Sequence, residues 1–111
     1  MATSIIPDPR PPFLARTYTC STGTIYPVTD PDHSSRKAIS KASLGIQNIP
    51  GYVMAGLKSY QCYNNWITVY KAQPNISSGD VLYLMNYTSW EISTTAQVTI
   101  IWIRADMIKA G

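Results

Sequence analysis

The chain has 111 residues, a length typical of a single domain that buries its own hydrophobic core. Charged residues make up 14% and aromatic residues 11%, a balance that excludes a disordered chain. The net charge of +3 comes from scattered residues, and the densest basic cluster (Arg36, Lys37 and Lys41) follows two aspartates, so we expect no nucleic-acid binding.

Targeting signals and cysteines point to a protein that works where it is made or leaves within a particle. No run of about 18 apolar residues is present, so we expect no membrane insertion. The first residues lack a basic stretch followed by an apolar one, which predicts no secretion signal. Cys20 and Cys62 could pair, although free thiols are favoured for a protein assembled in the cytosol. The glycosylation sequons at Asn75 and Asn86 are then interpreted as chance matches.

Residues 1–15 predict an extended, proline-rich arm in front of a domain spanning 16–111. Half of the prolines lie here, at Pro7, Pro9, Pro11 and Pro12. Each proline fixes its own φ and removes a backbone donor, which excludes a helix or an inner strand. Such an arm docks on another subunit, folds back over its own domain, or stays a tail without fixed structure.

The next segments predict two short strands and one short helix. Residues 16–20 and 24–28 carry strand-forming residues around Ser21–Gly23, which indicates a hairpin, with Pro27 placing the second strand at an edge. Residues 34–45 are the one place for a helix of a turn or two, with Ser34 or Ser35 as its cap and Gly45 as its stop.

From Gly51 onward, period-2 alternation predicts four further strands. They span residues 53–61, 66–72, 80–87 and 95–104, and the connections carry Asn, Pro, Ser and Gly. Short strands joined by loops of hairpin length are typical of an all-β fold, an antiparallel β-sandwich or jelly-roll. Parallel pairing would need crossover helices, for which the chain has no room.

The last strand is apolar on both faces. Its first face carries Ala96, Val98, Ile100 and Trp102, and its second carries Ile101 and Ile103. A strand of this kind must be covered on both sides, so we expect a second sheet on one side and another subunit on the other. The alternative cover for the second face is the proline-rich arm. The residues that we expect to form an assembly interface are Pro7, Pro9, Pro11, Pro12, Phe13, Ile101 and Ile103.

No set of residues suited to catalysis or metal binding is evident in the sequence. His33 is the only histidine and lies in a polar loop without a nucleophile motif, so we interpret it as a loop residue. One histidine and two distant cysteines do not make a zinc site. We therefore expect no enzymatic activity, no catalytic residues, no metal and no cofactor.

Exposed aromatic and amide side chains near two turns indicate a binding surface. Tyr, Trp and Asn together supply flat stacking faces and hydrogen-bonding groups suited to sugars and to protein interfaces. The alternative is that Tyr60 and Trp66 simply fill the core. The candidate ligand-binding residues are Tyr60, Tyr63, Asn64, Asn65, Trp66, Tyr87 and Trp90.

Several short motifs resemble the C-terminal domains of small tail-associated proteins of tailed bacteriophages and prophages. They are Ile49–Tyr52, Gly56–Leu57, Asn86–Ser89 and the closing strand Ala96–Arg104, so the resemblance covers residues 49–104. The resemblance implies a β-sandwich displayed on a virion appendage, often trimeric, and often credited with adhesion to the host surface.

We accordingly expect a non-enzymatic structural protein of a tailed phage virion, assembled in the host cytoplasm. In the first hypothesis it is a tail or fibre-like domain that binds host-surface glycans, forms a homo-oligomer, such as a trimer, and contacts other virion proteins. The alternatives are a capsid-decorating or neck protein that binds only virion subunits, and a free carbohydrate-binding lectin.

Overall fold

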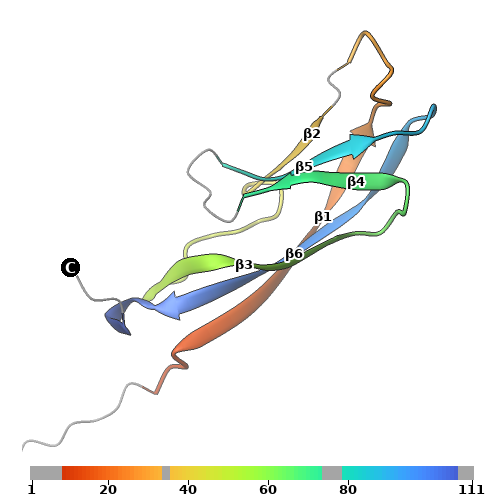
Figure 1. Cartoon of the computed structure of the whole chain (residues 1–111). Helices are drawn as coiled ribbons and strands as arrows, with labels where there is room; N and C mark the ends of the chain where they lie inside the picture. The colour runs from red at the N-terminus through yellow and green to blue at the C-terminus, as the bar shows by residue number, and fades with distance from the viewer. Residues whose placement is uncertain (1–8, 34–35, 74–78, 108–111) are drawn as a thin grey trace, which may run out of the picture.

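The structure, a computed structural model, describes residues 9–33, 36–73 and 79–107 and is built almost wholly from β-strands (Figure 1). The elements are β1 (Phe13–Ile25), β2 (Lys37–Ser40), β3 (Tyr52–Cys62), β4 (Ile67–Ala72), β5 (Asp80–Asn86), β6 (Ile92–Arg104) and the 3₁₀ turn η1 (Ala105–Met107). The strands pair antiparallel in two three-stranded sheets, in the orders β1–β6–β3 and β2–β5–β4. The predicted all-β, antiparallel, sandwich-like fold is confirmed.

The core lies between the two central strands, β6 and β5. On β6, Ala96, Val98, Ile100 and Trp102 are at most 1% exposed, as the alternation predicts. On β5, Val81, Leu82 and Leu84 are all fully buried and belong to the same core cluster. Full burial of an aliphatic side chain of this size stabilises a fold by about 1.5–3 kcal/mol, so these two strands dominate the hydrophobic stabilisation.

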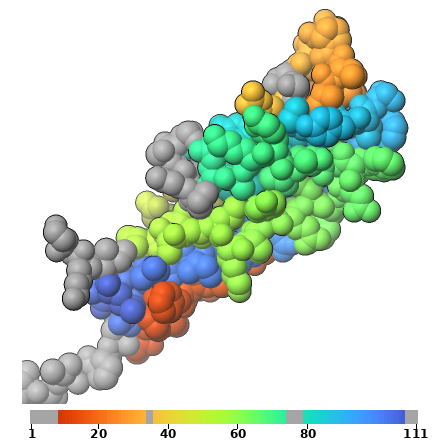
Figure 2. Space-filling view, viewed as in Figure 1, coloured from red at the N-terminus to blue at the C-terminus, as the bar shows by residue number. Residues whose placement is uncertain are grey.

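The β1–β6–β3 sheet is longer than the sheet that covers it. Figure 2 shows the green-to-cyan layer over part of the longer sheet, whose red, lime and blue strands continue past it toward the lower left. The connection from β2 to β3 adds Leu44 and Ile46, each 4% exposed, to the core. Of the three connections between β3 and β6, only β4–β5 is a hairpin within one sheet; the other two cross between sheets.

The predicted hairpin around residues 21–23 is wrong, because β1 runs unbroken from Phe13 to Ile25. The register with β6 shifts between Ser21 and Thr24, which marks a β-bulge. Gly23 has a φ of 67°, a left-handed conformation that glycine adopts readily. Thr22 is buried, and its hydroxyl accepts a hydrogen bond from the backbone N–H of Thr94 at 3.1 Å. This bond holds the bulge against β6, and the chain continues in the same direction.

The helix predicted over residues 34–45 is also wrong. Residues 37–40 form β2, which pairs with β5 through Ile39 and Leu82. Ser34 and Ser35, the predicted caps, lie outside the described residues. A turn follows β2 instead, and Ser40 caps it by accepting the backbone N–H of Ser43 at 3.0 Å. Burial of Ile39 between the sheets outweighs the weak helical preference of so short a segment.

Residues 9–12, here called the docked segment, are held against the domain itself. The Tyr52 hydroxyl donates to Pro11 O at 2.6 Å, and Arg104 Nη1 donates to Arg10 O at 2.7 Å. The Arg104 backbone N–H also donates to Pro12 O at 2.9 Å. Phe13–Ala15, assigned to the arm from sequence, open β1, so the described part of the arm is only the docked segment. Pro7 lies outside the described residues.

The two cysteines are separated by a strand and do not pair. Cys20 on β1 and Cys62 on β3 both lie opposite Ala96 of β6, one on each side, and both are free thiols. Two strand spacings separate their Cα atoms by about 10 Å. A disulfide requires less than about 7 Å, so the question left open by the sequence is resolved in favour of free thiols.

Candidate functional site

Three loops gather at one end of the sandwich, at the upper right of Figure 1. They span residues 26–33, 63–66 and 87–91. The side chain of Asn86, fully buried, joins two of the chain segments at this end. Its Nδ2 donates to Ile25 O at 3.0 Å and to Trp90 O at 2.7 Å, and its Oδ1 accepts from the Thr88 backbone at 2.9 Å. The loop that carries Trp90 is therefore fixed to the body.

Two tryptophans meet at this end. The rings of Trp66 and Trp90 have their centroids 5.9 Å apart at an interplanar angle of 72°, an edge-to-face arrangement. Trp66 is 61% exposed and Trp90 is 52% exposed, so the pair lies on the surface. The alternative in which Trp66 fills the core is thus excluded. Edge-to-face packing orients the rings relative to each other and leaves aromatic surface open to a partner.

Backbone and amide hydrogen bonds hold the loop that carries Trp66. Asn64 Oδ1 accepts the backbone N–H of Trp66 at 2.8 Å, and the Asn64 carbonyl accepts that of Ile67. Ahead of it, the backbone N–H of Tyr63 donates to Thr95 O of β6. This local bonding is typical of Asn in tight turns and fixes the backbone that carries Trp66.

The other candidate residues, Tyr60, Tyr63, Asn65 and Tyr87, are also exposed. The Tyr63 hydroxyl donates to Gln97 Oε1 at 2.5 Å. Tyr60, 49% exposed, lines a shallow hollow of about 120 Å³ that includes Gln97 and Thr99. Tyr60 therefore does not fill the core either. Asn65 is exposed, and Tyr87 is exposed with its hydroxyl 3.4 Å from Met85 Sδ.

Two of the predicted assembly residues, Phe13 and Ile103, belong to a row on the outer face of the longer sheet, and Val53, which was not predicted, completes it. Phe13, Ile103 and Val53 lie side by side in register across β1, β6 and β3. Phe13 is 55% exposed and Val53 38%, and Ile103 is half-buried. The next row places Ile101 opposite Ala15 and Gly56. Pro9, Pro11 and Pro12 are exposed in the docked segment. The second face of β6 is thus partly open to solvent in the single chain.

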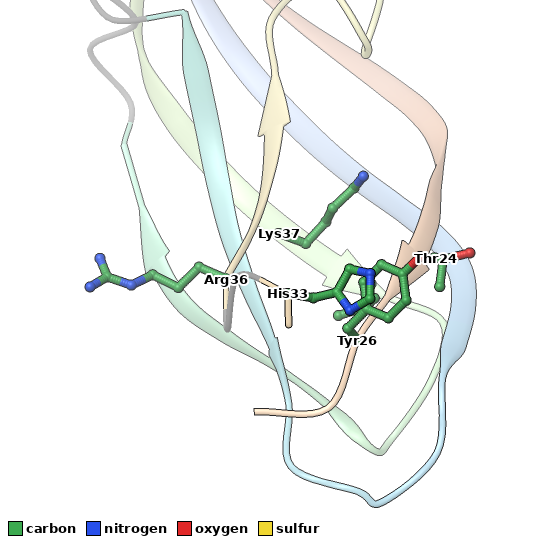
Figure 3. A pocket seen from close by; sticks show the side chains of 6 residues that line it. Thr24, Tyr26, His33, Arg36 and Lys37 are labelled. Atoms are coloured by element: carbon green, nitrogen blue, oxygen red, sulfur yellow. The ribbon is translucent and has the colours of Figure 1, made fainter. Parts of the chain in front are cut away.

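One pocket at the loop end was missed from sequence. It has a volume of about 270 Å³ and lies between the end of β1 and the start of β2 (Figure 3). Its lining residues are Thr24, Ile25, Tyr26, His33, Arg36 and Lys37. The sequence did not reveal this pocket because its lining residues come from separate stretches of the chain, and neither stretch forms a recognisable motif by itself.

Reactive or metal-binding clusters were also sought. Within residues 9–33, 36–73 and 79–107, no three His, Cys, Asp or Glu side chains lie close enough together to hold a metal ion. In the same part of the chain no helix has the length and apolar character needed to cross a membrane. Burial raises the pKa of both cysteine thiols, and the charge of Cys20 raises that of Cys62 further.

Comparison with known proteins adds no relative. No family model matches the chain, and no curated protein and no solved structure matches it.

Proposed function

We propose that this protein is a non-enzymatic binding domain that attaches to carbohydrate through the Trp66–Trp90 pair, as part of the surface of a tailed phage particle. The observation that carries the proposal is the exposed, edge-to-face tryptophan pair. The virion setting rests on the resemblance of residues 49–104 to tail-associated domains.

The chemistry of the pair supports carbohydrate as the ligand. Large aromatic rings left half-exposed forfeit stabilisation from burial, which a ligand or partner that covers them restores. The apolar faces of sugar rings fit flat aromatic surfaces, and nearby amides such as Asn64 and Asn65 supply donors and acceptors for hydroxyl groups. Because Asn86 fixes the loop of Trp90 before binding, little conformational entropy is lost on contact.

A glycan array with the purified chain tests the proposal, followed by titration calorimetry on the best ligand. Trp66→Ala and Trp90→Ala should each weaken binding about tenfold or more, while circular dichroism stays unchanged. Phe13→Ala is the matched control, because it removes a similarly exposed aromatic ring from the opposite end and should leave the affinity per site unchanged. A blank array, or equal losses in all three variants, would contradict the proposal.

A second function, subunit contact within the virion, is favoured by the row formed by Phe13, Ile103 and Val53. A half-exposed apolar row on an outer sheet face is typical of an interface. Light scattering should give a mass above 12.3 kDa for the wild type and a lower mass for Phe13→Ser. Trp66→Ala, as the control, should keep the mass of the wild type. A monomer at all concentrations would contradict self-association.

The two functions separate further in particles. A capsid-decorating or neck protein would be incorporated into particles while its array stays blank. A free lectin would bind glycan and be absent from purified particles. The proposed adhesion domain should show both incorporation and binding.

A further inference from the structure

We infer that the pocket between β1 and β2 is a second ligand site, distinct from the Trp66–Trp90 pair, and that it binds a sugar ring bearing a carboxylate. It lies at the same end as the loops described above, between residues 24–26 on one side and His33, Arg36 and Lys37 on the other (Figure 3). Its volume of about 270 Å³ is near the lower end of ligand pockets, which suits a single ring better than an extended chain.

The pocket has an ordered aromatic wall. The rings of Tyr26 and His33 stack with centroids 3.5 Å apart and an interplanar angle of 10°. His33 Nδ1 in turn donates to Asp30 Oδ2 at 3.0 Å. The backbone N–H of Asp32 donates to the other Asp30 oxygen at 2.8 Å and lowers the pKa of that carboxyl, an effect to which His33 adds. The imidazole is thus held against Tyr26 by a carboxylate that is itself anchored.

The charge of the pocket is positive. Lys37 is half-buried, and in the described part of the chain its ammonium has no ion-pair or hydrogen-bond partner. A Cβ on Gly23 would lie 3.7 Å from Lys37 Nζ, so the side chain reaches from β2 across to the bulge of β1. No aspartate or glutamate is among the lining residues, and Asp30 is hydrogen-bonded to His33. An anionic group is the ligand that an ammonium without an ion-pair partner favours.

The neighbours of Lys37 favour a carboxylate on a sugar over free phosphate. Phosphate sites are usually built from several backbone N–H groups or an arginine fork. The Arg36 guanidinium lies over the Tyr70 ring, 5.0 Å from its centroid, and Figure 3 shows it pointing away from His33 and Lys37. What remains is one ammonium and an aromatic wall. A uronic acid matches these with its carboxylate and its ring face.

Amide NMR of the full chain, titrated with sodium glucuronate, tests the inference. Saturable shifts should appear at residues 24–26 and 36–37, and glucose, which has the same ring without the carboxylate, should produce none. Lys37→Gln should weaken glucuronate binding about tenfold, equivalent to about 1.4 kcal/mol. Lys37→Arg should retain most of it, and Lys58→Gln, which removes an exposed lysine from β3, should change nothing.

Three outcomes would overturn the inference: no saturable shift, shifts that survive Lys37→Gln, or inorganic phosphate and acetate that compete as strongly as glucuronate. If Lys37→Gln failed to fold, two other measurements would replace it. Added salt should weaken the binding of glucuronate to the wild type, and Lys37→Arg should still bind glucuronate. The titration is repeated in Trp66→Ala. Binding there supports an independent pocket even if the glycan proposal for the tryptophan pair fails, and its loss contradicts the second site.

Discussion

Asn86 offers the sharpest test of how the fold supports the loop end. Its amide makes four hydrogen bonds, two as donor to the carbonyls of Ile25 and Trp90 and two as acceptor from the backbone and hydroxyl of Thr88. The side chain is fully buried, so water cannot replace these bonds without a rearrangement of the loop. In Asn86→Ala all four bonds are lost and their partners are left inside the protein.

The expected loss of stability follows from this count. At about 1 kcal/mol net for each bond, Asn86→Ala should cost about 4 kcal/mol. Total stability of a domain is only about 5–15 kcal/mol, so the loss is large. At roughly 4–8 °C per kcal/mol, the melting temperature should fall by about 15–30 °C. Urea unfolding monitored by circular dichroism measures the free energy, and Asn65→Ala, an exposed asparagine in the neighbouring loop, should stay within about 0.5 kcal/mol of the wild type.

Asn86→Asp separates the hydrogen bonds from the shape of the side chain. The variant keeps the acceptor oxygen that serves Thr88 but replaces the donating amide nitrogen with a carboxylate oxygen that faces the carbonyls of Ile25 and Trp90. Only the protonated acid can donate to either carbonyl, so relative to the wild type the variant should be more stable at pH 4 than at pH 7. A loss below about 1 kcal/mol in Asn86→Ala, or no pH dependence in Asn86→Asp, would refute the reasoning.

Other predictions concern the core, the thiols and one turn. In urea unfolding, Trp102→Phe should lower the free energy of unfolding by only about 1 kcal/mol, because an aromatic ring stays buried and the indole N–H that is lost has no partner in the described structure. Trp102→Ala should lower it by about 3–5 kcal/mol. At pH 8, Cys20 and Cys62 should react with a thiol reagent more slowly in the folded than in the unfolded chain, because their raised pKa values reduce the thiolate fraction. The reaction rate of the folded chain should rise as the pH rises. A disulfide found by mass spectrometry would contradict the assigned register. Gly51→Ala should lower the free energy of unfolding by about 1–2 kcal/mol, because Gly51 has a φ of 81° and a Cβ there would overlap the Arg10 side chain of the docked segment. Gly56→Ala is the control and should have little effect, because the space around Gly56 is open.

The parts of the fold that sequence predicted well are those governed by burial alone. The alternation of Ala96, Val98, Ile100 and Trp102 identified the buried face of β6, and all four are in the core. Period-2 patterning also located β3, β4 and β5 to within one residue at each end. These predictions held because side chains alternate in a strand whatever its partners are.

The failures came where pairing decided the structure. Ser21–Gly23 has the composition of a turn, but β6 is long enough to pair with β1 on both sides of it, so the glycine serves a bulge. Residues 37–40 form a strand because β5 offers an unpaired edge, which the local sequence does not reveal. Which loops cross between the sheets was unpredictable for the same reason. At the loop end, sequence named Trp66 and Trp90 but could not show that their rings pack edge to face.

The order of residues along β6 bears on how the two proposed functions coexist. Ile103, at the C-terminal end of the strand, belongs to the apolar row, while Ile92 at the other end lies next to the loop of Trp90. Eleven residues at about 3.3 Å each separate these ends by about 35 Å. A subunit that covered the apolar row would therefore leave the tryptophan pair and the Lys37 pocket open. The two surfaces are far enough apart for one chain to be anchored at one end while it binds a ligand at the other, which is the geometry that a displayed attachment domain requires.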